Sequence, residues 1–182
     1  MNLVGIKAVE CCTWVIAYSD FVQRVYAFFV ASMHRWHVLV TCLGKAQHVV
    51  KRLSDTRWSA HANAVKALCH GYTEIQTALV EIAQDKDQPR DAAHEAESLS
   101  KKMDKLEAKF LTILWNDILG RFNETSKTLQ KEDMDLAVAV NLIQSLKLYV
   151  NDIRDKFEDY ERKAKAETIN SEYHDNKRRA TK

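Results

Sequence analysis

Residues that break regular structure are scarce in this chain, and this scarcity limits what it can fold into. The 182 residues include one proline and four glycines. A fold of many short strands needs frequent turns, which are usually built from Gly, Pro or Asn-Gly pairs. The remaining composition, 46% hydrophobic and 29% charged, is ordinary for a globular protein. We therefore expect an all-α fold of long amphipathic helices packed in a bundle.

Apolar residues recur along the chain at three- and four-residue steps, which is the spacing of one face of a helix. This period predicts four helices, near residues 2–40, 57–85, 90–119 and 133–165. Pro89 suits the first turn of the third helix, and Gly120 is a candidate break at its end. Gly71 is a weak point inside the second helix, because glycine lowers helix propensity.

The first predicted helix has an unusually wide apolar face. Its members are Val4, Ala8, Cys11, Val15, Tyr18, Phe21, Val22, Val25, Phe28 and Phe29. A helix that is apolar over so much of its circumference must lie between other elements, but the other predicted helices are mostly one-sided. We therefore expect the stripe from Val15 to Phe29 to lack a neighbour within the chain. It would then pair with a second copy or with a helical protein partner.

The charge of the chain is nearly balanced, with a formal net charge of +2. Such a charge is too small to attract nucleic acid over the whole surface, so any basic site must be local. The last dozen residues hold one basic cluster, Lys177, Arg178 and Arg179. This tail is expected to be flexible. The cluster could be a nuclear-import signal or a phosphate contact. The alternative is that its charges are only solvated and have no function.

The cysteines and the apolar amino-terminal region indicate in which cellular compartment the protein is expected. Cys11, Cys12, Cys42 and Cys69 lack the two-residue spacer of zinc sites, and no secretory signal precedes them. We expect reduced thiols in an intracellular protein, nuclear or otherwise cytoplasmic. Charged residues interrupt the apolar region throughout, so no membrane span is expected.

Two small groups of polar residues are candidates for a metal site or a catalytic site. His34 and His37 share a helical face, and Cys42 follows a few residues later. A zinc site would need a fourth ligand. An ordinary pair of histidines at an interface is therefore the simpler interpretation. Asp133 and Asp135 look like a helix cap and a first-turn acid that interacts with the helix dipole. We therefore expect no catalytic residue, no metal ion and no cofactor.

The segment from Leu53 to Ala60 reads Leu-Ser-Asp-Thr-Arg-Trp-Ser-Ala and introduces the second predicted helix. Its Ser, Asp and Thr are all suitable N-caps, which places Arg57 and Trp58 in the first turn. A helix amino-terminus attracts anions, so this cation and aromatic ring are candidates to contact a phosphate and a base. The alternative is that Trp58 is a core residue and Arg57 a solvated charge.

This Thr-Arg-Trp-Ser step resembles that of hAT-type, cut-and-paste DNA transposases and the host genes derived from them. Further matching segments are residues 2–5 (NLVG), 34–36 (HRW), 110–119 (FLTILWNDIL) and 156–160 (KFEDY). Together they resemble the subgroup of hAT-derived proteins named zinc finger MYM-type protein 1-like. In that subgroup a large helical insertion splits a ribonuclease H-like core, and the Arg-Trp step lies at the front of the insertion.

The resemblance implies a division of the chain. Residues 1–44 would be a helix of a disrupted ribonuclease H-like core, residues 45–170 the helical insertion, and residues 171–182 a flexible basic tail. The acids that hold two metal ions in such enzymes lie outside the matching segments. The resemblance therefore implies a truncated, non-catalytic fragment with at most residual binding of DNA or protein.

A DNA site is also implied by the resemblance. Trp58 would stack on a base flipped out of the flanking DNA, and Arg57 would contact a phosphate. Two alternatives remain open at this point. The chain is either a helical protein-interaction or dimerisation module, or a truncated version of a longer active DNA transposase.

Overall fold

The computed structural model describes residues 13–44, 49–54 and 58–168, and of Trp58 it describes only the backbone. These residues form helices and no strand, which confirms the all-α prediction. The helices are α2 (Thr13–Val30), α3 (Met33–Leu43), α4 (Trp58–His70), α5 (Tyr72–Gln84), α6 (Arg90–Met103), α7 (Leu106–Leu129), α8 (Leu136–Asp155) and α9 (Phe157–Ala166).

The prediction of one helix over residues 2–40 is wrong within the described part of this range. Helix α2 ends at Val30 and α3 begins at Met33, with residues 2–12 outside the described ranges. Ser32 between them is extended, with φ −147° and ψ 133°. This turn brings α3 back against α2 and α5. Packing therefore breaks a helix where the sequence contains neither Gly nor Pro.

The second predicted helix breaks at its predicted weak point. Helix α4 ends at His70 and α5 begins at Tyr72, on either side of Gly71. Gly71 is buried, and a Cβ atom built on it would lie 2.9 Å from Cδ2 of Leu43. Glycine at this position thus allows α3 to approach the junction of α4 and α5 closely.

The third and fourth predicted helices also break, at positions that the sequence analysis did not identify. The third divides into α6 and α7 at Asp104 and Lys105, whereas Gly120 lies within the continuous α7. The candidate break at Gly120 is therefore wrong. Lys156 separates α8 from α9. Pro89 stands one position before the first turn of α6, at its N-cap.

The wide apolar face of α2 lies in the core of the protein. Phe21 and Val25 are 1% exposed and Phe28 is 2% exposed. Helices α3, α4 and α6 all contact α2, so the chain itself covers these residues. The expectation that this stripe lacks a neighbour is wrong, because the four predicted helices break into more segments and these surround α2.

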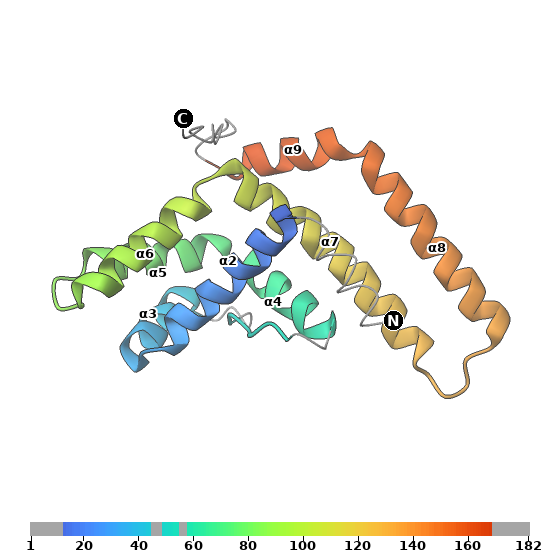
Figure 1. Cartoon of the computed structure of the whole chain (residues 1–182), viewed down its shortest axis with the longest axis horizontal. Coiled ribbons are helices and arrows are strands. Elements are labelled where there is room, and N and C mark those ends of the chain that lie inside the picture. Colours follow the sequence, from blue (N-terminus) through green and yellow to red (C-terminus); the bar gives the residue numbers. More distant parts are fainter. Residues whose placement is uncertain (1–12, 45–48, 55–57, 169–182) are drawn as a thin grey trace, which may run out of the picture.

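Helix α7 packs along α4 and contributes Leu119 to the core, and α8 and α9 form an arm beside it (Figure 1). Helix α8 returns from the far end of α7 along a diverging path, and α9 crosses back to the first half of α7. The Tyr160 hydroxyl donates to Oδ2 of Asp117 at 3.0 Å, and the rings of Phe157 and Phe110 lie 5.1 Å apart. Both contacts join α9 to α7, and a hydrogen bond of 3.1 Å from the Arg121 guanidinium to the Ser145 hydroxyl joins α7 to the middle of α8.

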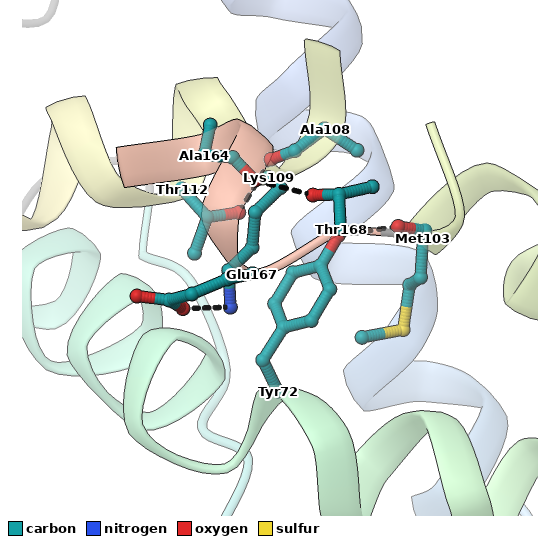
Figure 2. Close-up of polar contacts among 8 residues, drawn as sticks. All are labelled: Tyr72, Met103, Ala108, Lys109, Thr112, Ala164, Glu167 and Thr168. Carbon is teal, nitrogen blue, oxygen red and sulfur yellow. Dashed lines mark hydrogen bonds and ion pairs between the residues drawn. The ribbon is translucent and has the colours of Figure 1, made fainter. Parts of the chain in front are cut away.

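An ion pair between a buried lysine and a half-exposed glutamate connects the residue just after α9 to α7 (Figure 2). Lys109 of α7 is 4% exposed, and its Nζ lies 2.7 Å from a carboxylate oxygen of Glu167. The same ammonium group lies 4.1 Å from the ring centre of Tyr72, whose hydroxyl donates to the Met103 carbonyl at 2.8 Å. These contacts bring together α5, the end of α6, α7 and the residues just after α9.

No helix of the described ranges is long and apolar enough to cross a membrane. The predicted division at residue 44 stays a prediction. Helices on both sides of it share one core, because α3 packs on α5 and α2 contacts α4 and α6.

Candidate functional site

The predicted DNA-binding residues lie almost wholly outside the described ranges. These are Arg57 and the tail residues Lys177, Arg178 and Arg179. Helix α4 begins at Trp58, so the described part of the chain places this residue in the first helical turn, as predicted. The role of its side chain stays a prediction.

The segment that leads to α4 is held in place by three contacts with the folded chain. Val50 is buried, the backbone N–H of Leu53 donates to Oε1 of Gln23 at 3.1 Å, and Nε2 of His61 donates to the Ser54 carbonyl at 2.8 Å. Lys51 and Arg52 are exposed between these anchors. The first turn of α4 contains no acidic residue. The segment therefore presents two exposed cations on an anchored backbone a few residues before α4.

A second cationic feature is a pocket of about 650 Å³ between α2, α6 and the start of α7. Aromatic residues line its α2 side, and lysines line the side formed by the end of α6 and the turn into α7. The aromatic residues are Trp14, Tyr18 and Phe21, and the lysines are Lys101, Lys102 and Lys105. The aromatic residues recur at four- and three-residue steps, so they share one face of α2, whereas the lysines come together where α6 ends and the chain turns into α7.

Lys102 lies between these two sides. Its Nζ is 4.9 Å from the ring centre of Phe21 and 3.5 Å from the Ala17 carbonyl oxygen. Burial, together with the nearby charges of Arg24 and Lys105, lowers the pKa of Lys102. A bound anion would relieve this repulsion and favour the charged amine.

The carboxylates that line the pocket do not neutralise all of its lysines. Glu97 pairs with Lys101 at 2.6 Å. Within the described ranges, neither Lys102 nor Lys105 forms an ion pair with a carboxylate. The pocket lining therefore holds the amines of Lys102 and Lys105, which form no carboxylate pair, together with the carboxylates of Glu97 and Glu107.

The aromatic side of the pocket suits a flat ring. Trp14 is 63% exposed, which is unusual for a residue that is normally mostly buried. Tyr18 is buried, and its hydroxyl donates to Thr112 Oγ1 at 3.1 Å, while burial raises the pKa of this phenol. Tyr18 is therefore a neutral wall, and Trp14 is the ring available for stacking.

The histidine and cysteine group contacts carboxylates of the chain. Nε2 of His34 lies 3.3 Å from Oδ2 of Asp85, and the Cys42 thiol donates to Glu81 at 3.6 Å. Burial, and then the Glu81 charge, raises the pKa of Cys42. Across the described ranges, no three His, Cys, Asp or Glu side chains are arranged to hold a metal ion.

Of the two acids before α8, Asp133 and Asp135, one caps the helix. The Asp135 carboxylate accepts a hydrogen bond from the Ala137 N–H at 3.0 Å, and Asp135 is the N-cap of α8. Asp133 lies in the turn before the helix. The cap is therefore Asp135, two residues later than the predicted helix start.

The pocket could not be predicted from the sequence because its aromatic side and its lysine side are about eighty residues apart in the chain. The lysine side of the pocket can be recognised in the sequence, because Lys101, Lys102 and Lys105 lie close together on α6 and in the turn that follows. The aromatic side gave no separate signal, because Tyr18 and Phe21 belong to the same apolar stripe as the core residues.

Searches with this chain found no matching family model, no matching curated protein and no matching solved structure.

Proposed function

We propose that this chain is a non-catalytic helical protein that binds single-stranded nucleic acid, in keeping with its resemblance to hAT-derived proteins, and that it acts in the nucleus. The observation that carries this proposal is the pocket in which Lys102 and Lys105 lie opposite the exposed ring of Trp14. Cations and an accessible aromatic ring are the two elements that single strands require.

The chemistry of the pocket favours a single strand over a duplex. Lys102 and Lys105 attract phosphate groups, whereas the face of Trp14 offers a stacking surface to an unpaired base. Each stacked base contributes about 1–3 kcal/mol and each neutralised phosphate adds to the salt dependence of binding. The expected affinity is modest, because only one exposed aromatic ring and two unpaired lysines meet here.

Arg57 and Trp58 remain a second proposed contact for the same strand, with the basic tail as a third. Lys51 and Arg52, which are exposed just before α4, support a phosphate contact at this helix start. Variants in the pocket, at the Arg57-Trp58 step and in the basic tail separate the contributions of these three places to binding.

We predict that Trp14→Ala weakens binding of a single-stranded oligonucleotide by roughly 5- to 150-fold, the loss of one stacked base. The double variant Lys102→Ala/Lys105→Ala should also weaken binding and lower the salt slope by about 0.7 for each lost phosphate contact. Fluorescence anisotropy with a labelled oligonucleotide at several salt concentrations measures both effects.

Lys86→Ala is the matched control, because Lys86 is an exposed lysine in the turn at the opposite end of α6. It should leave the affinity unchanged. If the pocket variants bind like the unmodified chain while Trp58→Ala or removal of residues 177–182 abolishes binding, the pocket is not the site.

We also propose that copies of the chain associate with each other. The observation that favours this second function is the apolar surface of α8, where Leu136 is 79% exposed and Leu148 65% exposed. Light scattering on concentrated protein should give the mass of a dimer. A monomer's mass at every concentration would contradict this proposal.

A further inference from the structure

Helix α8 carries a row of exposed apolar residues along one face. Leu136, Val140 and Ile143 follow each other at four- and three-residue steps, so they share a face of the helix. All three are at least half exposed. Isolated exposed apolar residues are common on protein surfaces, but a continuous row indicates a contact surface.

The same helix has the sequence pattern of a coiled coil. Leu136, Ile143 and Val150 repeat every seven residues, and a second apolar series repeats between them. The second series is Ala139, Leu146 and Ile153. In that series Leu146 and Ile153 are buried, whereas Leu136 and Ile143 of the first series are exposed. One side of the heptad seam is therefore covered by the chain itself, and the other side is open.

Charge along α8 indicates what covers the open side. Glu132 and Asp133, just before the helix, are exposed, and so are Lys147 and Arg154 in its second half. In the part of the chain that the structure describes, none of these four side chains forms an ion pair. A helix laid against α8 in the opposite direction would complement α8 best if its own start were acidic and its end basic. On the face of the apolar row a second copy of α8 has this charge distribution, because the acids of its second half, Asp152 and Asp155, lie on other faces of the helix.

We infer that two copies of the chain pair through α8 in antiparallel orientation, with Ile143 facing Ile143 of the other copy. This inference rests on the self-association proposed above and adds its surface and register. In this register Leu136 packs beside the Val150 position of the other copy, and Asp133 lies beside its Arg154. A parallel pair would instead place Lys147 next to Lys147 and the acidic starts next to each other, which like-charge repulsion disfavours.

Disulfide cross-linking of the full chain tests this register. In a background with the four native cysteines replaced by serine, Ile143→Cys should form disulfide-linked dimers on mild oxidation. Leu136→Cys and Val150→Cys should each form no disulfide-linked dimer alone but should form linked dimers when mixed. Val80→Cys is the control, because Val80 is an exposed apolar residue on α5 and should give no linked dimer. Helical circular dichroism of every variant shows that the serine background is folded.

A charge variant of the native chain provides an independent readout. Ile143→Glu should raise the dimer dissociation constant by roughly tenfold or more, because it places a carboxylate in an apolar contact. Val80→Glu should leave it unchanged. Linked dimers of Leu136→Cys alone would overturn the antiparallel register. A dimer that neither cross-links through α8 nor responds to Ile143→Glu would overturn this inference while leaving self-association intact, and a monomeric chain would overturn both.

Discussion

Replacing Phe29 with alanine should lower the free energy of unfolding by about 3–5 kcal/mol, the usual cost of removing a fully buried phenylalanine ring. Phe29 is 0% exposed at the centre of the core, and its ring meets that of Phe28 edge to face at 5.3 Å. This decrease has two parts. The ring no longer contributes its buried apolar surface, and the close-packed neighbours do not fully close the cavity that it leaves. Urea denaturation followed by circular dichroism measures it.

Ile16→Ala is the matched control on the same helix. Ile16 is 41% exposed, so its removal should change the free energy of unfolding by about 0.5 kcal/mol or less. If Phe29→Ala proved as mild as Ile16→Ala, the apolar face of α2 would not be part of the core. The expectation of an uncovered stripe on this helix would then stand.

Glu167→Ala should destabilise the protein by about 1–3 kcal/mol, because it leaves the Lys109 ammonium group buried without a carboxylate. The expected loss is below that of a fully enclosed pair, since the Glu167 side chain is 58% exposed and water reaches its carboxylate. Lys109 would keep its contact with the Tyr72 ring at 4.1 Å. Thermal unfolding at low and high salt measures the change.

A double-mutant cycle isolates the cost of the unpaired charge. Lys109→Met keeps most of the side-chain volume and removes the charge, so it should cost less than Glu167→Ala. In the Lys109→Met background, Glu167→Ala should have almost no further effect. Equal losses from Glu167→Ala in both backgrounds would show that Glu167 acts through something other than its ion pair with Lys109.

The helical class and the buried faces of this fold could be predicted from the sequence because both depend on local periodicity. The apolar stripe that predicted a helix near residues 2–40 is the stripe that α2 buries. The ends of the helices depend on packing instead. Ser32 and Lys105 are extended, although nothing in their local sequence requires it, whereas Gly120 continues α7.

The sequence predicts candidate sites only where their residues are neighbours in the chain. The Arg57-Trp58 step is such a case: α4 begins at Trp58, as predicted, whereas Arg57 and the Trp58 side chain lie outside the described ranges. The pocket combines Trp14 with Lys102, which no local pattern relates. Likewise, the exposed seam of α8 is recognised only once the structure shows which of its two apolar series packs against the rest of the chain.

Photo-cross-linking of an oligonucleotide that contains 5-iodouracil to the full chain tests the proposed function most directly. This base links to an aromatic ring on which it stacks, and mass spectrometry of the digested adduct identifies the residue. We predict an adduct at Trp14 that disappears in the double variant Lys102→Ala/Lys105→Ala. An adduct at Trp58 or in residues 177–182 with none at Trp14, or no adduct at all, would contradict it.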